Sequence, residues 1–210
     1  ALFKECYNRE MTLDYWKWRF LDNSVPGIFI WLAWDGNKAV AHYAVSPITL
    51  SIHNKEYLAA LSLTTMTHPK YRGLKLFPQL ANEVYRILTE MGYILVFGFP
   101  NRNSHRIFVN DLHWKDIYEI PTFQLGLSEN NKLNNNCINS SHDLDELVIM
   151  DNNFELNYNI TSSLEIPIQV KKNKTYLIWR YSRHPLNKYY NFAISNKGAA
   201  SSFCVVKKYL

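Results

Sequence analysis

The sequence contains little cysteine and no long hydrophobic run. Its three cysteines, Cys6, Cys137 and Cys204, lie far apart and are odd in number. They therefore indicate neither a disulfide framework nor a metal site. No apolar stretch approaches the roughly 20 residues of a membrane-spanning helix, and no signal peptide is visible. We expect a protein of the reducing cytoplasm, with neither a membrane span nor a bound metal.

The charged residues are not concentrated on any one segment. The net charge of +5 suits a phosphate-bearing ligand, nucleic acid or an acidic membrane surface equally well. A nucleic-acid-binding protein would gather its basic residues on one face, together with stacking aromatics. The dispersed charges do not follow that pattern, so we expect no nucleic-acid partner.

The chain has ample material for a core. Apolar residues make up 47% of its 210 residues and aromatic residues 15%, with fourteen tyrosines and six tryptophans. This length suits one domain, or one domain with a partial second. The many tyrosines and tryptophans indicate pockets with polar tips as well as bulk packing.

Residues 64–114 carry the clearest functional pattern. Thr64–Thr67 is strand-like, and Pro69 ends the predicted strand. Gly73 then lies just ahead of an amphipathic helix, surrounded by three basic residues, Lys70, Arg72 and Lys75. The free N–H groups and the dipole at a helix start both favour an anion, and glycine lets the backbone approach it closely. We therefore predict a phosphate-binding loop here.

The helix after this loop is predicted from its apolar spacing. The residues that recur at helical intervals are Phe77, Leu80, Ala81, Val84, Ile87, Leu88 and Met91. Pro78 suits the first turn of this helix and Gly92 suits its C-cap. The continuous apolar run Ile94–Phe99 predicts a buried strand.

Further elements are predicted on both sides of this stretch. A helix is expected over Leu13–Leu21 after a Thr12 cap. Asp35–Asn37 is a hairpin turn signal. The expected strands are Ile28–Trp34, Lys38–Val45, Ile48–Ile52, Tyr57–Thr67 and Asp116–Leu125.

Several of these segments together resemble the GNAT superfamily of N-acetyltransferases. His68–Phe77 resembles its acyl-CoA loop, and Gly98–Asn101 followed by a helix over Asn103–Trp114 resembles its next strand and helix. The region ahead of the loop is similar to a bacterial subgroup with a tryptophan-rich N-terminal helix. The residues that carry this similarity are Tyr15, Trp18-Arg19-Phe20, Gly36 and Ala41-His42-Tyr43-Ala44-Val45.

The resemblance implies an α/β (α+β) GNAT fold over residues 1–127. Such a fold has a mixed, mostly antiparallel sheet that splays to hold acyl-CoA and is flanked by helices. The family normally begins with a strand, whereas this chain begins with a helix-like segment. We therefore expect a further piece upstream of residue 1.

The rest of the chain differs in character. Residues 128–153 are polar and asparagine-rich, which predicts a long loop or linker, and residues 154–210 form a C-terminal extension. There, Tyr176–Tyr181 repeats the Tyr-x-x-Trp-Arg-aromatic pattern of Tyr15–Phe20, and a proline follows each copy. The repeat indicates a partial, degenerate second copy of the family's opening half. The alternative is a coincidence between two aromatic helices.

By the resemblance, acetyl-CoA is the expected co-substrate. Backbone N–H groups of the loop would hold its pyrophosphate, and the preceding strand would pair with its pantetheine arm. The residues implied are Met66, Thr67, Arg72, Gly73, Leu74, Lys75, Leu76, Phe77, Asn101, Asn103 and Phe108.

Two loop positions depart from the family pattern. Lys75 stands where the family usually has its second glycine, and Phe77 where glycine or alanine is commonest. Phenylalanine at the latter position is familiar in the subgroup, whereas the lysine is less expected. Lys75 either adds a cation for a phosphate, crowds the loop or is a solvated surface lysine.

The catalytic acid and base are poorly specified. Many relatives carry a tyrosine as the acid where this chain has Val109, and no carboxylate lies between Leu58 and Thr67. The candidates that remain are His105, Ser104 and His42, since histidine titrates near neutrality. Because proximity alone contributes much to acyl transfer, water-relayed deprotonation is a further alternative.

The predicted function is N-acetylation of a small amine, with an amino sugar or nucleotide-linked amino sugar suggested by the subgroup. Trp16, Trp18, Trp31 and Trp34 lie near the family's acceptor side and either stack on a sugar ring or belong to the core. The alternative function is a catalytically inactive acyl-CoA-binding or protein-interaction module. A tandem aminoacyl-transferring peptidoglycan enzyme is a variant of the first function. The oligomeric state stays open, with a homodimer among the alternatives.

Overall fold

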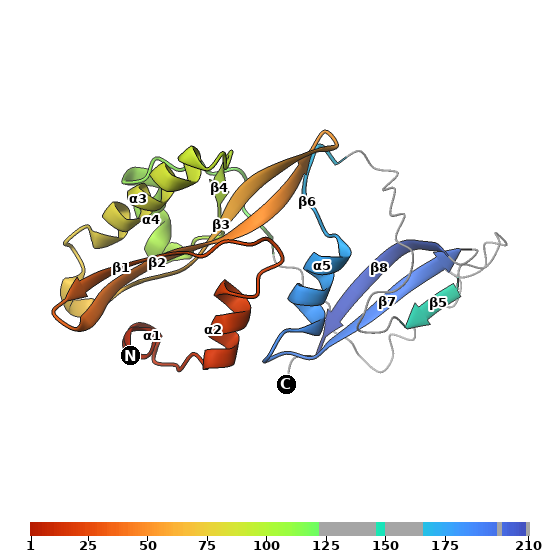
Figure 1. The fold of residues 1–210 in the computed structure, drawn as a ribbon, viewed down its shortest axis with the longest axis horizontal. Helices are drawn as coiled ribbons and strands as arrows, with labels where there is room; N and C mark the ends of the chain where they lie inside the picture. Colours follow the sequence, from red (N-terminus) through yellow and green to blue (C-terminus); the bar gives the residue numbers. More distant parts are fainter. Residues whose placement is uncertain (122–145, 150–165, 197–198, 209–210) are drawn as a thin grey trace.

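The computed structural model describes residues 1–121, 146–149, 166–196 and 199–208 (Figure 1). Its first part contains four α-helices and four strands. These elements are α1 (Leu2–Tyr7), α2 (Leu13–Phe20), β1 (Phe29–Asp35), β2 (Lys38–Ile52), β3 (Lys55–Thr67), α3 (Leu76–Glu90), β4 (Val96–Phe97) and α4 (Arg102–Asn110).

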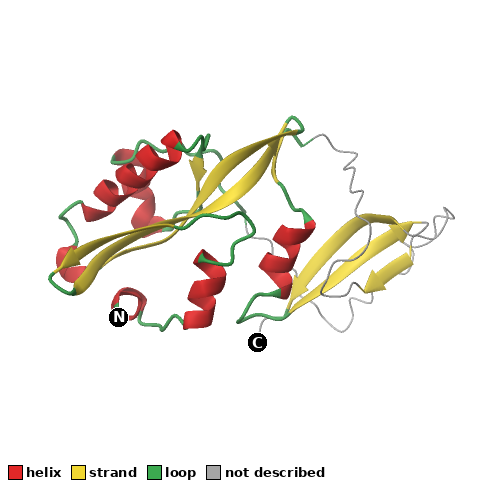
Figure 2. Cartoon of the chain, viewed as in Figure 1, coloured by secondary structure: helices red, strands yellow, loops and turns green. Residues whose placement is uncertain are grey.

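A mixed sheet in the order β1-β2-β3-β4 forms the centre of this part. The pairs β1–β2 and β2–β3 are antiparallel, whereas β4 runs parallel to β3. Helices α3 and α4 cover one face of the sheet, and α1 and α2 lie on the other (Figures 1 and 2). The predicted mixed, mostly antiparallel α/β architecture is therefore confirmed.

The core lies between the sheet and α3. Tyr43 on β2 is fully buried, and its ring lies 5.5 Å from that of Phe77 on α3. Phe77 in turn contacts Phe108 of α4, with ring centroids 5.0 Å apart. The side chains predicted to share one face of α3 supply its buried residues Phe77, Ala81, Val84 and Leu88, because residues three and four apart face the same side of a helix.

The prediction of two strands over residues 38–52 was wrong, because β2 runs through Pro47 without a break. Pro47 pairs with Ala60 of β3, and its carbonyl accepts a hydrogen bond from the Asn23 side chain at 2.8 Å. The Pro47 carbonyl therefore points away from β3. Because the nitrogen and the carbonyl of one strand residue point to the same side, the proline nitrogen faces away from β3 as well. On that side β1 begins only opposite Val45, so no ladder hydrogen bond is lost.

Two other predicted strands were also wrong in extent. The buried strand expected over Ile94–Phe99 is only the two-residue β4, and Phe99 is 70% exposed. No strand forms over residues 116–121, where Ile117 is 93% exposed; residues 122–125 lie outside the described part. A strand forms by backbone hydrogen bonds to a neighbouring strand, and β4, with two residues, offers very few such groups.

The second part of the chain contains a separate three-stranded sheet. Its strands β5 (Glu146–Ile149), β7 (Tyr189–Asn196) and β8 (Ala199–Lys207) pair in the order β5-β7-β8. Before β7 lies α5 (Lys174–Leu177), which continues as a π-helical turn over residues 178–182. β5 falls within the segment predicted as a linker, so that segment is not a loop throughout; the rest of it lies outside the described residues.

The two parts are joined by both a strand and a helix pair. β6 (Ile168–Val170) pairs with Leu50–Ile52 of β2. It lies on the same side of β2 as β1, which pairs with the earlier residues 38–45. α5 and its π-helical turn pack against α2, where Trp18 and Trp179 stack with centroids 5.4 Å apart. A helix followed by an antiparallel hairpin occurs in both parts, in keeping with a partial second copy, which stays a prediction.

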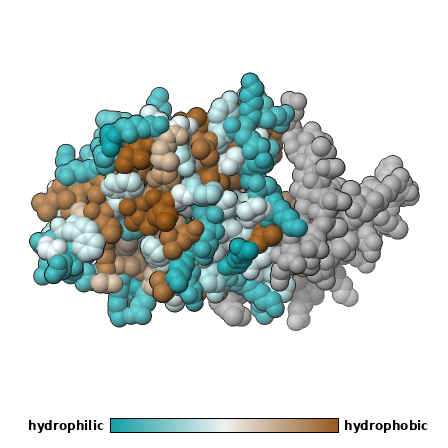
Figure 3. All heavy atoms as spheres, viewed as in Figure 1, coloured by the Kyte–Doolittle hydropathy of each residue, from teal (hydrophilic) through white to brown (hydrophobic). Residues whose placement is uncertain are grey.

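The surface of the first part is mixed in character. Hydrophobic residues gather in the middle of the face shown in Figure 3, with hydrophilic residues around them. No helix among the described residues is both long enough and apolar enough to span a membrane.

Cys6 and Cys204 are free thiols, and Cys137 lies outside the described residues.

Candidate functional site

A cavity of about 770 Å³ opens where β3 and β4 separate. The two strands pair only at Ala60–Val96 and Leu61–Phe97. Beyond these pairs, residues 62–67 of β3 line one side of the cavity and residues 98–101 line the other. A splayed parallel pair leaves backbone groups free on both edges, so an extended ligand fits between them as an added strand.

The start of α3 closes one end of this cavity. A short 3₁₀ turn over Pro69–Tyr71 leads into Gly73, whose φ of +87° suits glycine. Lys75 is the N-cap residue of α3 and adopts φ 56°, ψ 24°. Lys75 therefore has the left-handed conformation in which glycine is the least strained residue, which explains why glycine is usual at this position.

Gly98 lies where the two sides of the cavity are close together, next to Ser62. A Cβ atom at this position would lie 3.3 Å from the backbone oxygen of Ser62 and 3.3 Å from the Trp114 ring. Any larger residue would narrow the cavity where β3 and β4 begin to diverge. The absent side chain thus keeps the space next to Ser62 open.

The strand side of the cavity contains a β-bulge. The β2–β3 register shifts between His42 and Ala44, and Thr64 has a φ of 53°. This value is unusual for a β-branched residue, and such strain is concentrated at functional sites. Nδ1 of the buried His42 donates a hydrogen bond to the Thr64 carbonyl at 2.8 Å, which helps to hold the bulge in place.

Helix α1 reaches the same cavity from the opposite face of the sheet. Cys6 and Tyr7 line the cavity, and the Tyr7 hydroxyl donates to the Thr65 carbonyl at 2.7 Å. Partial burial raises the pKa of Tyr7, so its phenol is protonated at neutral pH. It can therefore serve as a proton donor.

An ion-pair network holds α1 in this position. The Glu5 carboxylate lies 3.0 Å from Lys38 Nζ and 3.3 Å from His68 Nε2. Nδ1 of His68 accepts a hydrogen bond from the Lys70 backbone N–H at 3.2 Å, so Nε2 carries the proton in the neutral ring. The network links α1 both to β2 and to the loop ahead of α3.

Most of the residues predicted for the co-substrate line this one cavity. They are Met66, Thr67, Arg72, Gly73, Lys75, Leu76, Phe77, Asn101, Asn103 and Phe108. Leu74 does not line it, because its side chain points into solvent and is 59% exposed. Asn101 also caps α4, with its side chain accepting from the N–H groups of Asn103 and Ser104 at 3.0 Å.

The three predicted catalytic residues are not brought together. Ser104 lines the cavity, but His42 and His105 do not. His42 is buried between Thr64 and the Phe20 ring, and burial lowers its pKa. The exposed His105 pairs with Asp116 at 2.8 Å. His42 thus supports the bulge, and neither histidine is placed to act as a base at the cavity wall.

No Asp, Glu or His is among the described residues that line the cavity. The groups able to exchange a proton there include the Cys6 thiol, the Lys75 amine and the phenols of Tyr7 and Tyr71. No local pattern pointed to Tyr7, since it lies 58 residues from its partner Thr65. Tyr7 is the last residue of α1, and the sequence pattern there does not distinguish it from other surface tyrosines.

The tryptophans near the N-terminus have different environments. Trp18 is 3% exposed and belongs to the contact between α2 and the second part of the chain, whereas Trp34 is 60% exposed. Trp16 packs against the cluster of Phe20, Ala44 and Leu63, and Trp31 against the main core. The expectation of core packing therefore holds for Trp18, Trp16 and Trp31.

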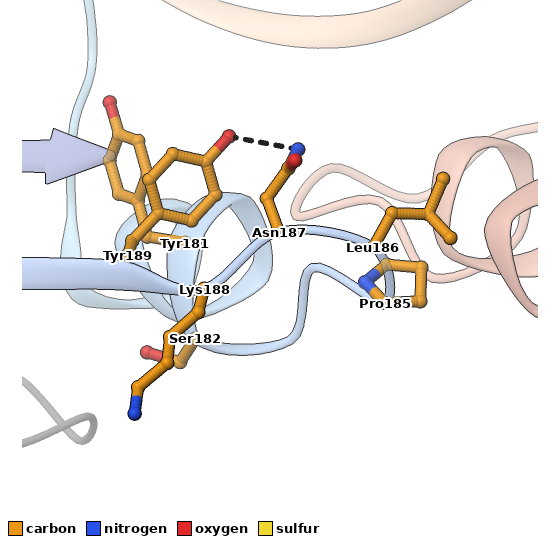
Figure 4. A pocket seen from close by; sticks show the side chains of 7 residues that line it. All are labelled: Tyr181, Ser182, Pro185, Leu186, Asn187, Lys188 and Tyr189. Carbon is orange, nitrogen blue, oxygen red and sulfur yellow. Dashed lines mark hydrogen bonds between the residues drawn. The ribbon is translucent and has the colours of Figure 1, made fainter. Parts of the chain in front are cut away.

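A second cavity of about 340 Å³ lies in the second part of the chain (Figure 4). It is lined by Tyr181, Ser182, Pro185, Leu186, Asn187, Lys188 and Tyr189. Figure 4 shows the rings of Tyr181 and Tyr189 side by side, with Pro185 and Leu186 on the opposite side. Its lining residues include no glycine loop at a helix start that could hold a pyrophosphate, so we do not assign the co-substrate to it.

Residues 1–108 match the family model of the acetyltransferase (GNAT) domain. No curated protein sequence matches the chain. Among solved structures, the chain is similar to glucosamine-6-phosphate N-acetyltransferase from Arabidopsis thaliana, with 12% identity and a TM-score of 0.39 over 45% of this chain and 65% of that one. The match thus spans less than two thirds of that enzyme.

The chain is also similar to an aminoglycoside acetyltransferase from an uncultured soil metagenomic sample, solved in complex with trehalose. That match has 14% identity and a TM-score of 0.45, and it covers 60% of this chain and 84% of that chain.

Proposed function

Because the chain belongs to the acetyltransferase (GNAT) family, we propose that it transfers the acetyl group of acetyl-CoA to the amine of a small molecule. The observation that carries the proposal is the cavity between β3 and β4. Ten of the eleven residues expected from the family resemblance line this single cavity of about 770 Å³, which lies within the usual size range of a ligand site.

The loop ahead of α3 would hold the pyrophosphate. Its glycine at φ +87° and the free N–H groups of the first turn of α3 suit an anion. Arg72 and Lys75 line the cavity and add positive charge. The pantetheine arm would then lie between β3 and β4, against the backbone of Met66 and Thr67. The open space beside Gly98 suits this path.

The reaction requires two proton movements. The acceptor nitrogen forms a bond to the acetyl carbon and gives up a proton, while the carbon–sulfur bond breaks and the thiolate takes one up. We assign the second proton to Tyr7, because it is the lining phenol that contacts the bulged strand. The first proton would leave through water, since the described lining residues offer no carboxylate or imidazole.

The acceptor would approach from the side of α1 and α2. This side carries Tyr7 at the cavity, while α3 and α4 occupy the opposite face of the sheet. The subgroup resemblance suggests an amino sugar or a nucleotide-linked amino sugar as the acceptor. We propose the cytoplasm as the compartment, in keeping with free thiols at Cys6 and Cys204.

A second candidate function is an acyl-CoA-binding module without catalysis. The observation that favours it is the lack of Asp, Glu and His among the described lining residues. Release of free thiol from acetyl-CoA, measured across a panel of amino sugars and other small amines, separates the two functions. Amine-dependent release supports the enzyme, and binding without any release supports the module.

A further inference from the structure

The contact between the two parts of the chain is nearly symmetric. Nε1 of Trp18 donates to the carbonyl of Trp179 at 2.7 Å, and Nε1 of Trp179 donates to the carbonyl of Trp18 at 2.9 Å. Such an exchange is what a local two-fold axis between two copies of one helix produces. The residues that follow the tryptophans, Arg19 and Arg180, are therefore equivalent across this axis.

Both arginines approach the same Trp18 ring, and no acidic side chain in the described part of the chain pairs with either of them. Their Cζ atoms are 6.0 Å and 5.9 Å from the centre of the Trp18 ring. Every ion pair found among the described residues involves other side chains. Both arginines are only partly exposed. Two like charges held together in a desolvated place are unfavourable unless an anion joins them.

The surrounding groups add to the positive potential. His184 lies 4.2 Å from the Trp18 ring, and burial together with Arg180, Lys207 and Arg19 lowers its pKa to about 4. No carboxylate contributes to that shift. Nδ1 of His184 accepts from the backbone N–H groups of Leu186 and Asn187. The imidazole is therefore neutral at physiological pH, and the two guanidinium groups remain charged.

The arginine pair lies on the side of the sheet from which an acceptor would approach. Arg19 is on α2, and its neighbour Phe20 packs with its ring centroid 6.0 Å from that of His42. His42 in turn donates to the carbonyl of Thr64 in the bulge at the cavity wall. Through Phe20, the residue next to Arg19, α2 thus contacts the His42 ring that supports the bulge at the cavity wall.

We propose that Arg19 and Arg180 together bind a phosphate group carried by the acceptor amine. The inference rests on the proposed acetyltransferase function. The guanidinium group matches phosphate geometry with two parallel hydrogen bonds, and one from each part of the chain would clamp the group across the interface. The second part of the chain would then contribute directly to acceptor recognition.

The first test measures binding of inorganic phosphate by calorimetry with saturating CoA present, which keeps the co-substrate site filled. The variants are Arg19→Gln and Arg180→Gln. The matched control is Arg183→Gln, which removes the same charge from an exposed position three residues further on. We expect each of the first two variants to weaken phosphate binding at least tenfold and the control to leave it unchanged.

Two results would overturn the site. One is no phosphate binding by the unaltered protein, and the other is equal binding by all three variants. Arg19→Lys and a thermal unfolding curve for each variant guard against a fold defect. If Arg19→Lys keeps its melting temperature but binds phosphate more weakly, the loss is due to the missing guanidinium group and not to a lost charge or a fold defect.

The second test separates an acceptor phosphate from a free ion. Thiol release is compared with glucosamine and with glucosamine 6-phosphate as acceptors. Faster turnover of the phosphorylated amine, lost in Arg180→Gln, supports the proposal. Phosphate binding without preference for the phosphorylated amine contradicts the acceptor role. If neither amine is acetylated, the result argues against the proposed function for these acceptors, and the binding test alone decides on the site.

Discussion

The hydroxyl of Tyr7 donates a hydrogen bond of 2.7 Å to the backbone carbonyl of Thr65. This contact joins the first helix to the residue next to Thr64, the strained residue of the bulge with φ 53°. It therefore places a protonated phenol at the wall of the cavity on the side away from α3. Tyr7 is thus held where it can protonate the leaving thiolate.

Replacing Tyr7 by Phe should lower kcat about 10²-fold or more, because the leaving thiolate loses its proton donor. The KM for acetyl-CoA should change little, since the loop ahead of α3 is untouched. Steady-state thiol release measures both. Tyr57→Phe removes a hydroxyl from β3 outside the cavity and serves as the matched control. An unchanged kcat in Tyr7→Phe would remove Tyr7 from the mechanism.

Loss of either indole N–H at the interface should destabilise the protein. In Trp18→Phe or Trp179→Phe a buried carbonyl loses its donor, which costs about 1–3 kcal/mol. The double variant should show a coupling free energy of about 0.5–3 kcal/mol in a denaturant-unfolding cycle. The exposed Trp34→Phe is the control. Additive effects of the two changes would mean that the reciprocal bonds do not act as one unit.

Replacing Lys75 by Gly should stabilise the fold and weaken co-substrate binding. Lysine at φ 56° costs the folded state about 1–2 kcal/mol of backbone strain, which glycine would relieve. Glycine also makes the unfolded chain more flexible, and this offsets about 0.5–1 kcal/mol of the gain. The melting temperature should therefore rise slightly, while the affinity for acetyl-CoA falls severalfold with the lost charge. A lower melting temperature would contradict the assignment of strain.

The stability of the protein should fall on acidification in part through His184. Its folded-state pKa of about 4 lies below the ordinary value of 6.5, so the unfolded state binds more protons between these values. The free energy of unfolding therefore rises with pH across this window, and the contribution of His184 to it is lost as pH falls. Urea unfolding at pH 7.5 and pH 5 should show a smaller difference for His184→Gln than for the unaltered protein. An equal difference would exclude this role for His184.

Local patterns in the sequence predicted the elements that depend on neighbours along the chain. The Thr12 cap of α2 is present, with its side chain accepting from the Tyr15 N–H. The apolar spacing of α3 and the loop at Gly73 were also predicted correctly. Each of these features is fixed within one or two turns of the chain, where short-range hydrogen bonding and periodicity decide the outcome.

The errors arose where distant segments decide the structure. Pro47 indicates a break, but β2 continues because no strand lies on the side of its nitrogen. The run Ile94–Phe99 reads as a full strand, but β4 separates from β3 after two residues. The contacts of Tyr7 with Thr65 and of Trp18 with Trp179 join residues that are 58 and 161 positions apart, and no local pattern encodes them.

The cavity between β3 and β4 should bind acetyl-CoA through the loop ahead of α3. Calorimetric titration of acetyl-CoA into the unaltered protein, Arg72→Glu and Lys70→Glu measures this binding. Arg72 lines the cavity, whereas Lys70 lies in the same loop but outside the lining. We predict binding to the unaltered protein and to Lys70→Glu, with no detectable binding to Arg72→Glu. Absence of binding to the unaltered protein, or equal affinity in all three, would rule out this loop as the acetyl-CoA site.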